Sequence, residues 1–144
     1  GYITEKIDEG FYRRFVVKSL YDEAEEYTII KGDIRDKSKE IYVESFEVGL
    51  VSILDKSFKN CDIIVMDELG CAEDEISTFT SKVFQILDSS KLVLGVLKEA
   101  DCNFLNDIRS RGDVKVISID IENRDHVIKD IKDILSDFIN SPYL

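Results

Sequence analysis

From residue 43 onward, short apolar runs alternate with longer segments in which apolar residues recur at helical spacing. The runs are rich in Ile, Val and Leu, as is typical of strands buried on both faces, and they are residues 62–67, 92–97 and 114–119. The helical spacing predicts four helices, at residues 44–59, 74–87, 101–111 and 124–139. This alternation predicts an α/β fold in which helices cover both faces of a mostly parallel sheet, a three-layer α/β/α arrangement.

The first thirty residues have a different pattern. Residues 2–7 and 11–20 are rich in β-favouring side chains, and Asp-Glu-Gly at residues 8–10 is suited to a turn. The pattern predicts an N-terminal antiparallel β-hairpin. A third strand is expected at residues 27–31, followed by a polar loop at residues 32–39.

Length and composition predict a single domain over residues 1–144, because Pro142 is the one proline and no Gly/Ser-rich linker interrupts the chain. Nineteen basic and thirty acidic residues give a net charge of -11, which disfavours nucleic acid and anionic membrane surfaces as partners. The longest apolar runs, residues 63–66 and 92–97, are too short to span a bilayer.

The cysteines indicate a cytoplasmic protein. Cys61, Cys71 and Cys102 are odd in number and widely spaced, without a Cys-x-x-Cys pair. This spacing favours three reduced thiols over a zinc site or a disulfide framework.

Two acidic residues, Asp67 and Glu68, directly follow the apolar run of the first predicted parallel strand. Ligands of open α/β sheets bind beyond the carboxyl ends of the strands, where these two side chains are expected. The pair has the form of a Walker B motif, in which Asp67 holds Mg²⁺ and Glu68 orients or deprotonates a water molecule. The alternative interpretation is a solvated turn or helix start.

Flanking residues make the pattern more specific. Residues 67–73, Asp-Glu-Leu-Gly-Cys-Ala-Glu, resemble the Asp-Glu-Ile-Gly-x-x-Glu segment of the THEP-type nucleoside triphosphatases, a small P-loop NTPase family first described from thermophiles that includes a human cancer-related NTPase. Residues 1–7, Gly-Tyr-Ile-Thr-Glu-Lys-Ile, are similar to the family's Gly-Phe-Tyr-Thr-x-Glu-Val. Further similar segments follow in order, at residues 43–47, 93–96, 104–111 and 122–125.

The resemblance implies a P-loop NTPase-like fold and Mg²⁺-dependent hydrolysis of ATP, GTP and other nucleoside triphosphates with broad base specificity. It implies that Asp67 serves the metal and Glu68 the water, while Glu73 matches a third acidic position or is a solvated carboxylate in the first turn of a helix. Asn123 and Arg124 follow the last predicted strand and either contact the base or act as a helix N-cap and a surface arginine.

Two departures from the family pattern stand out. The family begins with a β-strand, a Gly-x-x-x-x-Gly-Lys-[Ser/Thr] loop (Walker A) and a helix, and the sequence contains no such unit. We therefore expect a fragment that is inactive alone and that self-associates through the sheet edges left by the missing strand. The second departure is at residues 98–103, where Lys98 remains the candidate for the phosphates, with Arg109 or Arg111 as substitutes if they are not simply surface residues.

Two alternative functions remain open. A relative that has lost the P-loop would be a non-enzymatic nucleotide-binding or regulatory module, which the net charge of -11 permits. A nucleotide or polynucleotide kinase would share the fold and the metal site. His126, the single histidine, lies within the last predicted helix and is expected at the surface.

Overall fold

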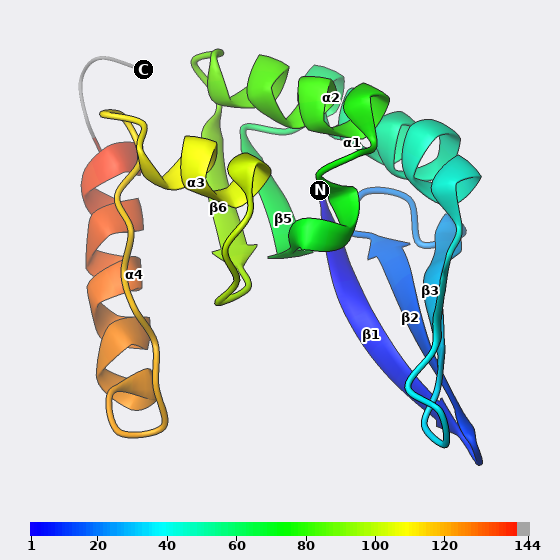
Figure 1. Ribbon diagram of the computed structural model, residues 1–144. Helices are drawn as coiled ribbons and strands as arrows, with labels where there is room; N and C mark the ends of the chain where they lie inside the picture. Colours follow the sequence, from blue (N-terminus) through cyan, green and yellow to red (C-terminus); the bar gives the residue numbers. More distant parts are fainter. Residues whose placement is uncertain (141–144) are drawn as a thin grey trace. The chain divides into compact units, whose positions relative to one another are not determined.

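A computed structural model describes residues 1–140 of the chain (Figure 1). Contacts divide the chain into two compact units, Gly1–Ile108 and Arg109–Leu144. All six strands lie in the first unit, and the second contains the longest helix. The combination of sheet and helices confirms the α/β class, while the single domain over residues 1–144 stays a prediction.

The first unit is built on one mixed sheet with the strand order β4-β3-β2-β1-β5-β6. Its strands are β1 (Tyr2–Glu9), β2 (Tyr12–Ser19), β3 (Glu26–Asp33), β4 (Lys39–Ile41), β5 (Ile63–Leu69) and β6 (Leu92–Leu97). Neighbours from β1 to β4 are antiparallel, whereas β5 is parallel to both β1 and β6. The expected mostly parallel sheet is therefore wrong for the described strands, because short connections join β1 to β4 and such connections require antiparallel neighbours.

The hairpin of β1 and β2 turns at Gly10, whose φ of 64° lies in the left-handed region that a tight hairpin turn requires. Strand β1 extends two residues further than the sequence pattern predicts, whereas β2 is one residue shorter at each end than the predicted 11–20. Asp8 and Glu9, expected in the turn, pair instead with Arg13 and Tyr12 across the hairpin. An ion pair of 2.7 Å between Arg13 Nε and Asp8 Oδ1 explains how acidic residues are accommodated there.

Strand β4 lies at the end of the segment predicted to be a loop. Lys39 pairs with Gly32, and Ile41 pairs with Ile30 of β3. Its three residues are all exposed. The strand therefore depends on hydrogen bonding to the edge of β3 rather than on an apolar pattern of its own.

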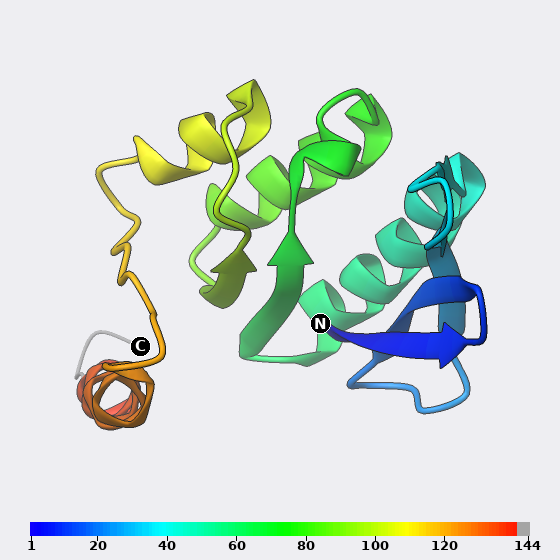
Figure 2. The ribbon, with the colours of Figure 1, turned by 60° about the horizontal axis from the view of Figure 1, so that its bottom comes forward.

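Strands β1 and β5 meet only near the start of β1. Their parallel register pairs Tyr2 with Met66, and no further register pair joins these two strands within residues 1–140. Figure 2 shows β1 starting beside β5 and then running away from it. The antiparallel half of the sheet thus opens away from β5 on the side where Asp67 and Glu68 lie, near the carboxyl end of β5.

The helices of the first unit share one hydrophobic core with the sheet. A π-helical segment, η1 (Ser45–Leu50), continues into α1 (Val51–Asn60), and a 3-10 turn, η2 (Cys71–Glu73), precedes α2 (Ser77–Leu87) and later α3 (Asn103–Arg109). Phe46 and Phe79 form an edge-to-face pair with ring centroids 5.5 Å apart. The core is completed by fully or almost fully buried side chains, among them Leu50, Ile53, Leu54, Ile64, Met66, Val83, Ile86 and Leu105.

The second unit differs from the sequence prediction at residues 114–119, which are extended but form no strand. Val116 and Ile119 are more than half exposed, and β6, the expected neighbour, pairs with β5 alone among the described strands. An apolar run without a partner strand cannot complete its backbone hydrogen bonds as a sheet does. The helix α4 (Arg124–Ile139) has the predicted bounds.

Within residues 1–140, no helix combines the length and the apolar character that crossing a bilayer requires. The three-layer α/β/α arrangement stays a prediction.

Candidate functional site

Asp67 and Glu68 lie in an irregular part of β5. Met66 pairs with Gly95 and Leu69 pairs with Leu97, so Asp67 and Glu68 together face a single residue of β6. Such a β-bulge re-aims side chains. Glu68 has a φ of 58°, a conformation that costs energy for any residue with a side chain and that concentrates at functional sites.

Thr4 of β1 holds Asp67 in place. Its backbone N–H donates to Asp67 Oδ2 over 2.8 Å, and its hydroxyl donates to the backbone carbonyl of Asp67 over 3.2 Å. The sequence analysis did not single out Thr4, although it belongs to the segment 1–7 that resembles the nucleoside triphosphatases. The strand that diverges from β5 therefore fixes the orientation of the first acidic residue of the pair.

Lys98, at the end of β6, reaches the second acidic residue. Its Nζ lies 3.2 Å from Glu68 Oε2, and both side chains are about two-fifths exposed. Its backbone N–H donates to the carbonyl of Leu69 over 2.8 Å. The residues expected to activate water and to supply positive charge are thus in direct contact.

Glu73 is buried, with 5% of its surface exposed, so the alternative of a solvated first-turn carboxylate is wrong. One of its oxygens, Oε2, accepts the backbone N–H of Gly70 over 3.1 Å. Burial raises the pKa of the Glu73 carboxyl, against the lowering effect of backbone hydrogen bonds and of the Lys98 charge. Burial likewise raises the pKa of the Tyr2 phenol, with Glu73 and Asp67 adding to the effect.

These side chains border an open cavity of about 200 Å³ in the first unit. One wall is acidic and comes from the loop after β5, and Lys98 lies beside it. The opposite wall comes from the antiparallel strands and is mostly apolar. The lining residues outside the acidic loop are Thr4, Phe15, Ile29, Ile30, Lys39, Ile41 and Lys98.

The oxygen atoms at this site suit a magnesium ion that receives most of its ligands from a bound substrate. Within residues 1–140, no cluster of three or more His, Cys, Asp or Glu side chains forms a complete metal site. The carboxylate of Asp67 accepts the N–H of Thr4 at Oδ2, and within residues 1–140 Oδ1 has no hydrogen bond and can serve as a ligand. Mg²⁺ prefers oxygen ligands and is commonly held by one or two carboxylates together with phosphate oxygens and water, which this arrangement allows.

Asn123 and Arg124 belong to the second unit, where they begin α4. The side-chain oxygen of Asn123 accepts the N–H of Asp120 over 2.9 Å, and its amide nitrogen donates to the carbonyl of Ser118 over 2.9 Å. Asn123 therefore closes a local turn through its side chain, and its backbone carbonyl accepts the N–H of Val127 over 3.0 Å, as the carbonyl of an N-cap residue does. A cap through the Asn123 side chain stays a prediction. A contact of Asn123 or Arg124 with a base stays a prediction.

The other candidates belong to the second unit. Arg111, named as a substitute cation, pairs with Asp113 over 2.7 Å. His126 is an exposed residue of α4, as expected. Arg109 ends α3.

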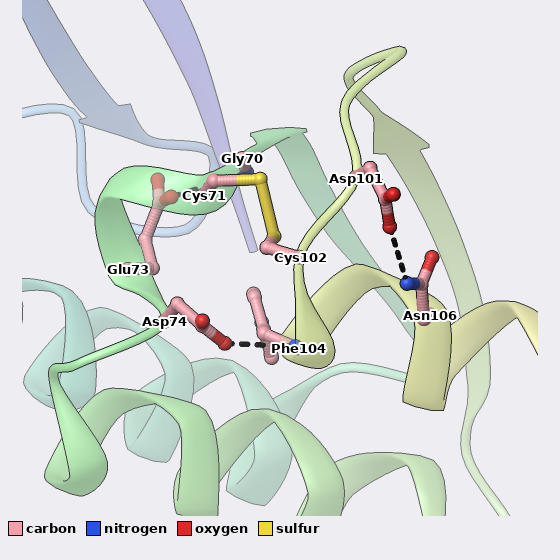
Figure 3. Close-up of a disulfide and its surroundings, with 8 residues drawn as sticks. All are labelled: Gly70, Cys71, Glu73, Asp74, Asp101, Cys102, Phe104 and Asn106. Carbon is pink, nitrogen blue, oxygen red and sulfur yellow. Dashed lines mark hydrogen bonds between the residues drawn. A yellow bond between two sulfur atoms is a disulfide. The ribbon is translucent and has the colours of Figure 1, made fainter.

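The loops after β5 and β6 are joined by a disulfide between Cys71 and Cys102, whose Cα atoms are 5.8 Å apart (Figure 3). The expectation of three reduced thiols is therefore wrong, and Cys61 alone is free. The sequence did not predict this disulfide, because the two cysteines are 31 residues apart. The parallel arrangement of β5 and β6 brings their loops within the distance that a disulfide needs.

Comparison with known proteins gives consistent results. A family model described as NTPase matches residues 1–132. The nucleoside-triphosphatase THEP1 of Thermotoga maritima is 29% identical over 140 residues, which cover 94% of this chain and 79% of that protein. The proteins of the same name from Methanocaldococcus jannaschii and Thermofilum pendens are 27% and 32% identical, over 91% and 87% of this chain and 76% and 72% of their own lengths. No solved structure matches the chain.

Proposed function

The chain belongs to the NTPase family, and on that premise we propose that its complete gene product hydrolyses nucleoside triphosphates to nucleoside diphosphate and phosphate in the presence of Mg²⁺. The arrangement at the end of β5 carries the proposal: Asp67 is held by Thr4, and Glu68 lies in a bulge beside Lys98. Relatives named nucleoside-triphosphatase support the same reaction class.

In this proposal Asp67 is the protein's ligand for Mg²⁺. The bound ion would supply positive charge to the phosphate oxygens as the γ-phosphoryl group is transferred. The Thr4 amide fixes one oxygen of the Asp67 carboxylate. This hydrogen bond limits rotation of the carboxylate, so the direction of its other oxygen is also set. Such orientation in advance of binding lowers the reorganisation that the reaction requires.

Glu68 is the proposed acceptor of the proton from the attacking water. A carboxylate acts in this way when its oxygen comes within hydrogen-bond reach of the water. The Lys98 ammonium holds the Glu68 carboxylate at the mouth of the cavity, and it also provides a positive charge near the expected phosphates. Substrate binding would redistribute this ion pair, because the phosphates compete for the ammonium group.

Binding of the substrate phosphates requires groups that this sequence does not supply. The 144 residues contain no Gly-x-x-x-x-Gly-Lys-[Ser/Thr] segment, and the net charge of -11 opposes binding of a triphosphate. In P-loop proteins that segment supplies the backbone N–H groups and the lysine that hold the phosphates. We therefore assign the activity to a gene product that includes such a segment, and we expect the 144-residue chain alone to be inactive.

Base recognition is proposed for the start of α4. Arg124 is exposed, whereas the Asn123 side chain is engaged by Asp120 and Ser118. Arg124 is therefore the stronger candidate for stacking on or hydrogen bonding to the base. A single arginine makes few contacts with a base and can make them with adenine or guanine. Such a site would have broad base specificity and accept both ATP and GTP.

The decisive experiment measures phosphate release from ATP and GTP with and without Mg²⁺. The proteins are the complete gene product, its Glu68→Gln variant, a Glu99→Gln control at an exposed position, and the 144-residue chain. We expect turnover by the complete product and the control, a loss of roughly 10²- to 10⁴-fold in the variant, and none by the short chain. Turnover by the Glu68→Gln variant at the rate of the control would contradict the assigned role of Glu68.

A second candidate is favoured by one observation, the lack of a phosphate loop in this sequence. A nucleotide-binding or regulatory module would bind nucleotide without releasing phosphate. If no protein in the set turns over while the complete product binds nucleotide in a calorimetric titration, this module replaces the hydrolase. A kinase relative would transfer the phosphoryl group to an added nucleotide acceptor instead of water.

A further inference from the structure

Cys71 and Cys102 lie in the two loops that carry the proposed catalytic side chains. Cys71 opens η2, three residues after Glu68, and Cys102 directly precedes α3, four residues after Lys98. Their Cα atoms are 5.8 Å apart, within the range that a disulfide needs. Both residues are partly exposed, so small thiols and disulfides in solution have access to the bond.

The same loops are also joined by contacts that do not depend on the sulfur atoms. The backbone N–H of Lys98 donates to Leu69 over 2.8 Å on one side of the disulfide. On the other side, the carboxylate of Asp74 accepts the N–H of Phe104 over 2.8 Å (Figure 3). These contacts limit how far the two loops can separate after reduction, so the bond can form again without refolding.

The disulfide also borders the site itself. Cys71 lines the cavity together with Glu68, Glu73 and Lys98. Gly70, the preceding residue, donates its N–H to the buried Glu73 carboxylate. Cys71 follows Gly70 directly and is three residues from Glu68, so a change in its position is expected to alter the hydrogen bond between Gly70 and Glu73 and the position of Glu68.

We propose that Cys71 and Cys102 are a reversible redox modification site that sets the position of the Glu68 loop against the Lys98 loop. The oxidised state ties the loops together and keeps Glu68 paired with Lys98, whereas the reduced state lets them move apart around a substrate. This regulatory role rests on the proposed hydrolysis, but the existence of the redox pair does not. Oxidation is expected to lower turnover, because loop adjustment accompanies substrate closure in many enzymes.

The chemistry balances with glutathione disulfide as the oxidant. One protein thiolate attacks a sulfur of glutathione disulfide, which releases one glutathione thiolate and leaves a mixed disulfide. The second protein thiolate attacks the protein sulfur of that mixed disulfide and releases the second glutathione. Two protein thiols lose two protons and two electrons in total, and one glutathione disulfide becomes two glutathione molecules. A dithiol such as dithiothreitol reverses the reaction.

The test uses the complete gene product, equilibrated in glutathione buffers of graded ratio and then alkylated for mass analysis. We expect the wild type and a Cys61→Ser control to lose two alkylation sites together, at Cys71 and Cys102, without gaining the mass of glutathione. In Cys71→Ser and Cys102→Ser the remaining partner is expected to be either alkylated or to carry one glutathione as a mixed disulfide, because no second thiol is present to displace it. Pairing of Cys61 with either residue, or retention of all three thiols in every buffer, would overturn the site.

Loop position is measured by amide hydrogen exchange on the same samples. Reduction of the wild type is expected to speed exchange in peptides covering residues 69–73 and 98–102, and to leave the Cys71→Ser variant unchanged. Because the wild type is compared with itself, the result does not depend on whether a variant folds well. Equal exchange in both redox states would overturn the proposed control of loop position.

Phosphate release then separates this proposal from the proposed function. Oxidation is expected to lower turnover of the wild type by about three- to tenfold, and of the Cys71→Ser variant not at all. Equal turnover in both states would overturn the redox control and leave the hydrolase standing. No turnover in either state, combined with the expected thiol and exchange results, would overturn the hydrolase and leave the redox pair standing.

Discussion

Three acidic residues close together in sequence have three different environments. Asp67 is oriented by a backbone N–H of Thr4, Glu68 has a left-handed backbone conformation and an ion pair, and Glu73 is buried. Environment rather than residue type decides what a carboxylate does. We expect Asp67 to bind a cation and Glu68 to exchange its ion pair with Lys98 for a contact with water. Glu73 stabilises the backbone at Gly70.

Burial of Glu73 predicts a specific dependence of stability on pH. Its pKa in the folded chain is raised from the ordinary value of 4.5, so the folded state binds a proton more readily than the unfolded state. The contribution of Glu73 to stability is therefore favourable near and below pH 4.5 and is lost as pH rises through the folded pKa. Glu73→Gln should raise the free energy of unfolding at pH 7, and the difference from wild type should shrink as the pH falls.

Urea unfolding at a series of pH values measures this difference. Gln can still accept the Gly70 N–H through its amide oxygen, so the variant removes the charge and keeps the hydrogen bond. Glu75→Gln, at an exposed neighbouring position, is the matched control. A Glu73→Gln variant less stable than wild type at pH 7 would show that the ionised carboxylate is stabilised in place.

The backbone of Glu68 predicts a conflict between stability and activity. With φ at 58°, the Cβ of Glu68 clashes with its own backbone, and only glycine avoids this cost. We expect Glu68→Gly to raise the free energy of unfolding by about 0.5–1 kcal/mol, even though it removes an exposed ion pair of little value. The same variant should abolish phosphate release by the complete gene product.

Glu99→Gly provides the comparison, since Glu99 is not among the residues with positive φ. Glycine there gains no relief of strain and adds freedom to the unfolded chain, so stability should fall slightly. Thermal unfolding of the two variants beside wild type is sufficient. A Glu68→Gly variant that loses as much stability as Glu99→Gly would contradict the idea that strain is stored at Glu68.

At the scale of elements, the sequence predicts those parts whose signal is local. The bounds of β6 and α4 agree with the apolar run and the helical spacing, because each pattern is complete within the element. The strand β4 was missed since it depends on the edge of β3, and the strand expected at residues 114–119 does not form because a strand needs a partner. Strand pairing depends on two segments, so the sequence of one segment alone does not predict it.

The candidate site divides in the same way. Asp67, Glu68 and Lys98 were predicted because each follows an apolar strand run. Thr4 and the disulfide were not, since they involve residues 63 and 31 positions apart in sequence. Contacts at such a distance are set by the order of strands in the sheet, where β1 lies next to β5 and β5 next to β6.

One contact between elements predicts how α3 is anchored. The carboxylate of Asp74 accepts the N–H of Phe104 near the start of α3, a donor that the helix itself cannot satisfy. Asp74→Ala should lower the free energy of unfolding by about 1 kcal/mol, as removal of a helix cap does. Asp74→Asn keeps an oxygen acceptor and should recover most of the loss, while Glu75→Ala at an exposed position should have little effect. Urea unfolding gives all four values, and an Asp74→Ala variant as stable as Glu75→Ala would contradict the anchoring role.

At the scale of the whole molecule, charge and sheet edges oppose each other. The net charge of -11 repels a second copy of the chain, and this repulsion weakens as salt is added. The outer edge of β6 favours association, because among the described strands β6 pairs only with β5 and leaves backbone donors and acceptors available. Val96 on this strand is 47% exposed.

We therefore expect the 144-residue chain to self-associate in a concentration-dependent way, more strongly at 0.5 M than at about 0.05 M salt because screening removes the repulsion. Val96→Lys places a charge on the edge strand and should shift the chain toward the monomer. Val48→Lys is the matched control, since Val48 is equally apolar and more exposed but lies on η1. Sedimentation velocity at several concentrations distinguishes the variants. Equal dissociation by both substitutions would show that the effect does not depend on the edge of β6, and a monomer under every condition would remove this edge as an association surface.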